Sequence, residues 1–187
     1  MAKAQFNREE VIDKAILLFW QHGYSASSMQ QVVQATGLKP GSIYLAFGNK
    51  EGLFREALER YAQTSITRTR QVLENAPNVL KGICQIFEDN IAQSTQDNYC
   101  SCFLLKTRLE LAAEGNELHK LASEKLALME ALFRSSLETE FNPELSQRRA
   151  TSIMLHIFGI RVYGYQQDSE DRMRQGLQEG LPWLPWT

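Results

Sequence analysis

The sequence predicts an all-α protein of about nine helices. Apolar residues recur at i, i+3, i+4 and i+7 in nearly every segment that lies between turn signals. No run of alternating β-branched residues is long enough to predict a strand. With 187 residues, 43% of them apolar, the chain has room for a substantial core in one or two domains.

Residues that start and stop helices divide the N-terminal part of the chain into four helices. The first three are short, and the fourth extends to about Leu73. Its apolar positions follow a clean helical stripe. In chain order, the predicted starts and stops are Asn7, Gly23, Ser27 or Ser28, Gly37, Pro40 and Asn49.

A second group of helices follows a break at residues 75–78, where asparagine and proline interrupt the periodic pattern. Asn142 and Pro143 form a typical helix start within this group, a capping residue followed by proline. The predicted helices lie near 78–95, 99–113, 116–139, 143–166 and 169–180.

The charge pattern permits nucleic-acid binding at the N-terminal end. The whole chain carries a formal net charge of −2, which excludes a polybasic protein but not a local basic surface. No Asp or Glu occurs between Lys14 and Lys50, a stretch that also holds Lys39. Residues 1–60 hold seven basic and six acidic side chains, so the acidic excess belongs to the remainder of the chain.

Residues 23–54 carry the functional pattern. Gly37 allows a sharp turn between two short helices, as a helix-turn-helix requires. The starts of the second, third and fourth helices would each offer backbone N–H groups to phosphate. Such a surface suits a DNA backbone, where phosphate contacts set the position and base contacts set the sequence.

Over roughly residues 8–55, the sequence resembles the TetR-type transcriptional regulators. The combination is specific, whereas the glycine of the turn alone would be weak. The matching elements are Gly23-Tyr24, Ser27-Ser28-Met29, Ala35-x-Gly37, Gly41-x-Ile43-Tyr44, Phe47 and Asn49-Lys50-Glu51-x-Leu53.

The resemblance implies a helix-turn-helix DNA-binding domain over 1–50 and a helical ligand-binding and dimerisation domain over 51–187, linked by the helix that begins at residue 50. The implied partner is double-stranded DNA that carries a palindromic operator.

Three positions depart from the usual pattern of the family: Lys39 replaces a common Ser, Leu45 replaces a common polar residue, and Ser27 replaces a common Thr. Leu45 could contact a thymine methyl group. The implied DNA-binding residues are Ser27, Ser28, Met29, Lys39, Pro40, Gly41, Ser42, Tyr44, Leu45 and Lys50.

The C-terminal helices predict a homodimer and a pocket. The helix near 143–166 is apolar on two faces, so we expect one face to meet its own core and the other, with the helix near 169–180, a second copy. An unknown small-molecule effector would bind between helices. The candidate lining residues, each also a plausible core residue, are Phe87, Ile91, Phe103, Thr107, Arg108, Met129 and Phe133.

The three cysteines offer a second candidate site. Cys100 and Cys102 are predicted at a helix start, where the helix dipole lowers a thiol pKa. In a subset of the resembling family, a cysteine at the place of Cys102 senses oxidants or electrophiles. The alternative is that both thiols are small buried hydrophobic side chains. Cys84 is a possible disulfide partner, although the odd count favours a reducing compartment.

The expected function is therefore a sequence-specific transcriptional regulator, a repressor released from its operator by a small molecule or by an electrophile or oxidant. We expect no cofactor, no metal site, no enzymatic activity, no signal peptide and no membrane association, and thus a cytoplasmic protein. Two rivals remain: an enzyme with Cys100 or Cys102 as nucleophile, and a helical adaptor that does not bind DNA.

Overall fold

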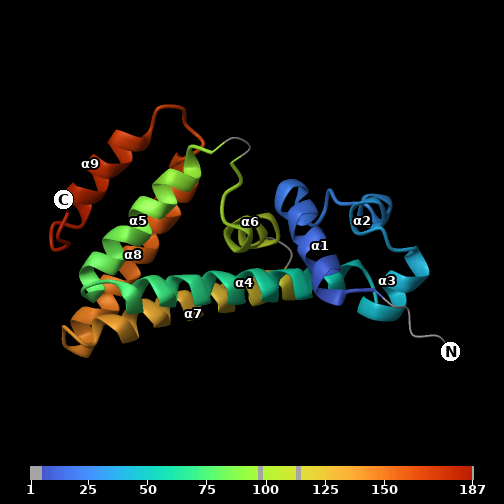
Figure 1. The fold of residues 1–187 in the computed structure, drawn as a ribbon, viewed down its shortest axis with the longest axis horizontal. Helices are drawn as coiled ribbons and strands as arrows, with labels where there is room; N and C mark the ends of the chain where they lie inside the picture. Colours follow the sequence, from blue (N-terminus) through green and yellow to red (C-terminus); the bar gives the residue numbers. More distant parts are fainter. Residues whose placement is uncertain (1–5, 97–98, 113–114, 187) are drawn as a thin grey trace. The chain divides into compact units, whose positions relative to one another are not determined.

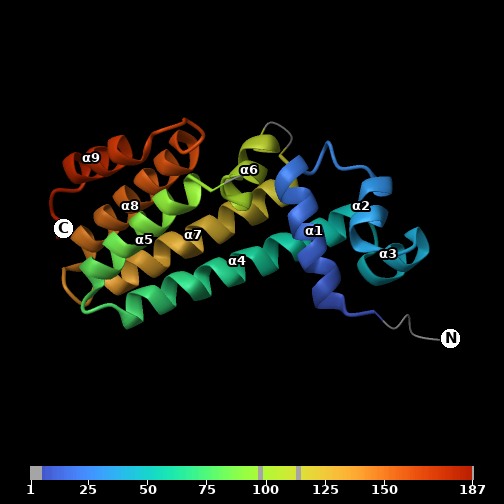
Figure 2. The same ribbon diagram turned by 45° about the horizontal axis from the view of Figure 1, so that its top comes forward.

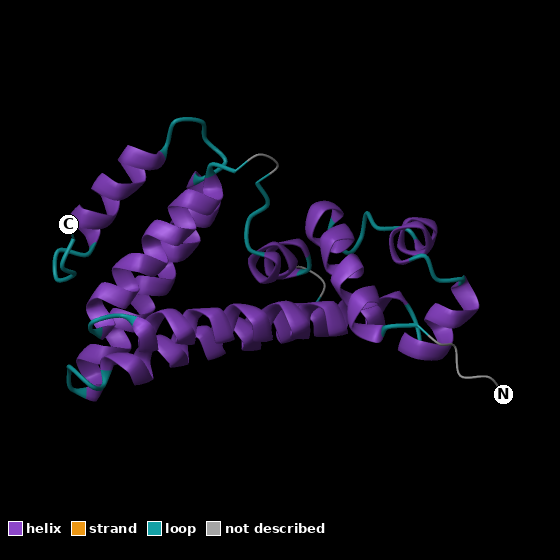
Figure 3. Cartoon of the chain, viewed as in Figure 1, coloured by secondary structure: helices purple, strands orange, loops and turns teal. Residues whose placement is uncertain are grey.

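The computed structural model describes residues 6–96, 99–112 and 115–186, and these residues form helices and connecting loops without any strand (Figure 3). The chain divides into two compact units, one of residues 1–64 and 103–125 and the other of residues 65–102 and 126–187. The helices are α1 (Arg8–His22), α2 (Met29–Thr36), α3 (Pro40–Phe47), α4 (Lys50–Asn75), α5 (Val79–Ser94), α6 (Phe103–Glu110), α7 (Glu117–Leu137), α8 (Pro143–Tyr163) and α9 (Glu170–Gly180) (Figure 1).

Local capping explains why the observed helix ends follow the predicted ones. The Asn7 side chain accepts hydrogen bonds from the backbone N–H groups of Glu9 and Glu10, at 3.1 and 3.3 Å. Asn142 accepts from Leu145 N–H at 2.9 Å and so begins α8. These bonds satisfy N–H groups that have no partner within the helix.

One helix is shorter than predicted. The segment expected to be helical over 99–113 forms a helix only over Phe103–Glu110, so Cys100 and Cys102 precede α6 instead of lying within it. Ala113 of the predicted range lies outside the described residues. The predicted division at residues 50 and 51 also differs from the two compact units, because α6 and the start of α7 pack with the N-terminal helices.

An aromatic cluster forms the core of the first unit. The ring of Phe54 on α4 lies 4.7 Å from Phe19 of α1, 5.0 Å from Tyr24 and 5.2 Å from Phe103 of α6, measured between centroids. Phe19, Phe54 and Phe103 are all fully buried or nearly so. Both ribbon views place α6 beside α1, as this cluster requires (Figure 2).

The second unit is built on the pairing of α5 with α8, and α9 packs on both. The segment after α9 closes this core. Trp186 packs against Phe87 of α5 in a tilted arrangement, with ring centroids 5.8 Å apart. The Arg149 guanidinium lies over the rings of Phe141 and Trp183, 3.9 and 4.2 Å from their centroids. These contacts make the C-terminal tail part of the unit.

Among the described residues, no helix combines the length and apolarity needed to cross a bilayer.

The aromatic cluster predicts a large loss of stability for Phe54→Ala. The variant removes a fully buried ring with three aromatic neighbours, so we expect the free energy of unfolding to fall by about 3–5 kcal/mol. Chemical denaturation followed by circular dichroism measures this change. Leu45→Ala, at a side chain 81% exposed, is the control and should stay within about 0.5 kcal/mol of the unsubstituted protein. Equal losses for the two variants would contradict the assigned core.

Candidate nucleic-acid interface

Two short helices and the turns around them present the candidate DNA surface. Ser28 begins α2 through a reciprocal capping box with Gln31. Gly37 then ends α2 with φ of +73°, in the left-handed region that glycine adopts without strain. Pro40 occupies the first turn of α3. The helix-turn-helix predicted from the sequence is thus present as a structural element.

The two faces of α3 have different neighbours. Ile43 and Phe47 are buried and attach the helix to the first unit. Tyr44 and Leu45 are 52% and 81% exposed, and Lys39 at the helix start is exposed as well. An exposed leucine and tyrosine beside a cation can contact thymine methyl groups and the backbone of a groove wall.

The other predicted DNA-binding residues of this segment have different degrees of exposure. Pro40 and Gly41 are exposed, whereas Ser42 and Met29 are half-buried. Ser28 is exposed although its hydroxyl takes part in the capping box. The DNA contacts of these residues remain predictions.

The structure corrects the role expected of Ser27. Its side chain is only 1% exposed, and its hydroxyl donates a hydrogen bond to the Gly23 carbonyl at 2.6 Å. The hydroxyl is therefore committed to the α1–α2 turn and is not available to a phosphate.

Lys50 also bonds within the protein. Its ammonium group donates to the backbone carbonyls of Tyr24 and Ser27 at 2.8 and 2.9 Å, and it lies 4.3 Å from the centroid of the Tyr24 ring. An ammonium has three protons, so a phosphate contact by Lys50 would have to use the remaining one. Its contact with DNA stays a prediction, and its bonds in the α1–α2 turn are what the structure shows.

Arg8 supports α3 from the neighbouring helix, which the sequence pattern did not reveal. Its guanidinium donates to the Ala46 carbonyl at 3.1 Å, lies 4.3 Å from the centroid of the Phe47 ring and pairs with Glu56. The last carbonyl groups of a helix lack partners within it, so a cation is favourable there. These contacts join residues far apart in sequence, and no local signal predicts them.

The predicted pocket residues are divided between the two compact units. Phe103, Thr107 and Arg108 belong to the first unit, and the other four candidates belong to the second. Arg108 is exposed, so it is not a buried cation that requires an anionic partner. Five of the seven are core residues with at most 1% exposure: Phe87, Ile91, Phe103, Thr107 and Phe133.

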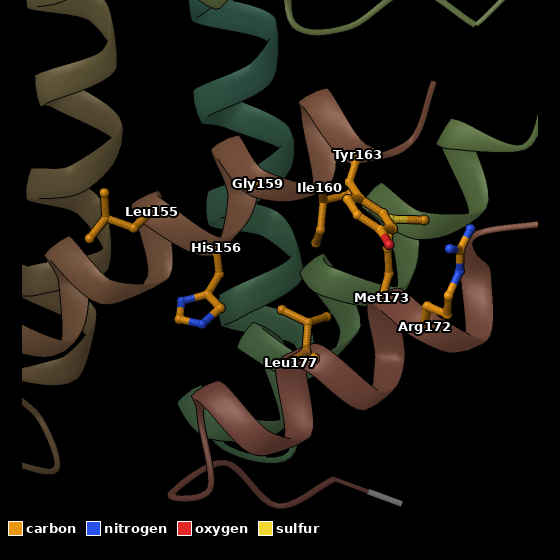
Figure 4. Close-up of a pocket in the computed structure, with 9 residues that line it drawn as sticks. Leu155, His156, Gly159, Ile160, Tyr163, Arg172, Met173 and Leu177 are labelled. Atoms are coloured by element: carbon orange, nitrogen blue, oxygen red, sulfur yellow. The ribbon is translucent and has the colours of Figure 1, made fainter. Parts of the chain in front are cut away.

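The second unit has an apolar groove between α8 and α9 with a volume of about 510 Å³ (Figure 4), and the pocket expected from the sequence stays a prediction. Gly159 and Tyr163 on α8 face Met173 and Gly176 on α9 across it. A Cβ added at either glycine would meet no atom within 4 Å. The groove lies on the two helices for which the sequence predicts a second copy as partner.

The three cysteines are free and half-buried. Burial raises the pKa of the Cys84 thiol above its ordinary value, which lowers the thiolate fraction at neutral pH and makes Cys84 a poor nucleophile. Cys102 lies directly before α6. No group of three or more metal-ligating side chains comes together in the part of the chain that the structure describes.

Comparison with known proteins agrees with this geometry. The family model "Bacterial regulatory proteins, tetR family" matches residues 11–57. The chain is 31% identical over 134 residues to the HTH-type transcriptional repressor ComR of Escherichia coli K12, an alignment that covers 71% of this chain and 64% of that protein. It is 30% identical over 103 residues to the repressor BdcR of the same organism, covering 54% and 52%. The chain thus aligns with less than two thirds of the length of these relatives.

A solved structure extends the likeness to the whole chain. A cysteine-substituted variant of the TetR-family regulator CifR, in complex with 26-bp operator DNA, has a TM-score of 0.81 and 25% identity, with 100% of both chains covered. The helix-turn-helix, the helical fold of the described residues and the sequence likeness agree. The chain belongs to the TetR family of bacterial regulatory proteins.

Proposed function

We propose that the chain is a transcriptional repressor that binds a palindromic DNA operator as a homodimer. The observation that carries this proposal is α3, which buries Ile43 and Phe47 while it exposes Lys39, Tyr44 and Leu45. The names of two relatives, repressors both, and the operator complex of CifR support it. Such a protein has no enzymatic activity and acts in the cytoplasm, where the DNA is.

The dimer is inferred from the surface of α8 and α9. Leu155 and Val162 on α8 are 65% and 61% exposed, a large apolar area beside an open groove. Exposed apolar patches of this kind mark interaction sites. A second copy is the expected partner on a palindromic operator, because a two-fold dimer presents two recognition helices to half-sites about 34–36 Å apart.

The DNA surface predicts distinct effects for Lys39→Ala and Leu45→Ala. Lys39→Ala should weaken binding to all sequences and lower the slope of log K against log salt by about one. Leu45→Ala should instead change the preference between duplexes that differ in thymine content, by about 1–3 kcal/mol per altered base pair. Titration of a duplex from directly upstream of the protein's own gene, at several salt concentrations, measures both.

Lys120→Ala is the control for charge, because Lys120 is exposed on α7 in the same unit and pairs with Glu117. It should leave operator affinity and salt slope nearly unchanged. If Lys39→Ala behaves like this control, α3 does not face the DNA backbone.

The dimer surface predicts that Leu155→Glu separates the copies. A carboxylate in a buried apolar interface has no partner and is costly to desolvate. Sedimentation at micromolar concentration should give the mass of two chains for the unsubstituted protein and of one for the variant. Leu109→Glu, at a side chain with the same 65% exposure on α6, is the matched control and should stay dimeric. A single-chain mass before substitution would refute the dimer.

For the signal, we infer a small molecule, with an electrophile or oxidant acting at Cys102 or Cys100 as the specific candidate. Both thiols are half-buried, so a small reagent has access to them, whereas the raised pKa of Cys84 disfavours that site. Two solved CifR structures in complex with operator DNA are of variants with substituted cysteines.

Treatment with N-ethylmaleimide tests this candidate. It should lower the operator affinity of the unsubstituted protein roughly tenfold, within the usual range of coupling between two sites. Cys102→Ser combined with Cys100→Ser should remove the response, and Cys84→Ser should retain it. If the double variant still responds, these thiols are not the sensor.

A further inference from the structure

Helix α1 ends in a way that leaves two backbone groups to be satisfied from elsewhere. In a continuing helix, the Trp20 carbonyl would accept the Tyr24 N–H. Gly23, with φ of +82° and ψ of 179°, instead turns the chain out of the helix. Both groups then bond to side chains of α6 (Phe103–Glu110), which belongs to the same compact unit.

Lys106 and Glu110 supply these bonds, and we call the pair the α6 clamp. Lys106 Nζ donates to the Trp20 carbonyl at 2.5 Å. The Glu110 carboxylate accepts from Tyr24 N–H at 3.1 Å and from Ser25 N–H at 2.8 Å. In a continuing helix, Tyr24 and Ser25 would each donate to the carbonyl four residues before, so two backbone bonds are replaced by three that involve a charged group.

The Glu110 carboxylate also lies close to Gly23. A Cβ built on Gly23 would lie 2.6 Å from Glu110 Oε2. Gly23 is required by its positive φ, whereas the carboxylate is the far end of a flexible, exposed side chain that could move aside. A glutamate at the last position of a helix is also disfavoured by the helix dipole, so its interaction with the turn must offset that cost.

The opposite side of the same turn is held by a cation. Lys50 donates to the carbonyls of Tyr24 and Ser27, so Tyr24 has its N–H on the Glu110 carboxylate and its C=O on the Lys50 ammonium. Ser28, the next residue, begins α2. The position of the α1–α2 turn therefore sets where the helix-turn-helix begins.

We propose that Glu110, together with Lys106, is a positioning residue for DNA binding. It acts through the α1–α2 turn, and it fixes the start of α2 without touching DNA. This inference rests on the proposed function, because it assumes that the helix-turn-helix binds an operator.

Glu110→Gln tests the proposal through the sign of its effect. Removing a negative charge from a DNA-binding protein by itself favours binding to any duplex. Loss of the clamp should do the opposite and raise the Kd for the upstream duplex roughly tenfold, in line with the strength of hydrogen bonds to charged groups. Binding to a scrambled duplex of the same length should not weaken.

Glu124→Gln is the matched control, since Glu124 is an exposed carboxylate on α7 in the same unit. It removes the same charge and should leave operator affinity unchanged or slightly higher. If Glu110→Gln gives the control's result, Glu110 does not position the interface.

Amide hydrogen exchange on the full chain without DNA tests the clamp independently. The Tyr24 and Ser25 amides should exchange at least about tenfold faster in Glu110→Gln and Glu110→Ala than in Glu124→Gln. Unchanged exchange would overturn the clamp. If the unsubstituted protein binds no duplex, the proposed function and the role in DNA binding fail together, while faster exchange would still establish the clamp as the support of the turn.

Discussion

The end of α1 at Gly23 is the constraint on which the rest of the first unit depends. The backbone there adopts φ of +82°, which allows the chain to leave α1 and begin α2 a few residues later. Ser27 closes the turn from within by donating to the Gly23 carbonyl. Lys50 and Glu110 hold it from α4 and α6. The turn sets the position of Ser28, which caps α2, and therefore the position of the α2 and α3 helices that follow.

Several cationic side chains of the first unit form ion pairs or hydrogen bonds within that unit. Lys14 pairs with Glu10, Arg60 with Asp13, and Arg8 with Glu56, while Lys50 bonds to backbone carbonyls. Lys39 stays exposed at the start of α3. An acid-free stretch of sequence therefore gives a smaller basic surface than the count of lysines suggests. Because phosphate neutralisation supplies non-specific affinity, we expect weak non-specific binding, and the proposed homodimer on a matched site would supply the remaining affinity.

Local interactions were predictable from the sequence, and distant ones were not. The starts of α1, α2 and α8 followed from Asn7, Ser28 and Asn142, because each caps N–H groups two or three residues ahead. The partners of Gly23 and Tyr24 could not be found this way, since Glu110 lies 86 residues beyond Tyr24. A helical pattern locates a charged residue but does not identify what it touches.

The pocket shows the same limit for apolar residues. Phe87 and Phe133 fit a core and a ligand cavity equally well by periodicity, and the structure buries both. The groove between α8 and α9 depends instead on Gly159 and Gly176, whose missing side chains leave space that no hydrophobic pattern reveals.

The length of α6 is compatible with a role in regulation. α6 has eight residues and is therefore about 12 Å long; Cys102 directly precedes it, and Glu110 is its last residue. A signal needs only differential affinity for two positions of such a helix. Coupling between sites in proteins is typically about 1–3 kcal/mol, which is what a single hydrogen bond to a charged group contributes. If the chain binds an operator as proposed, loss of one bond at Tyr24 or Ser25 is of the size needed to change operator affinity.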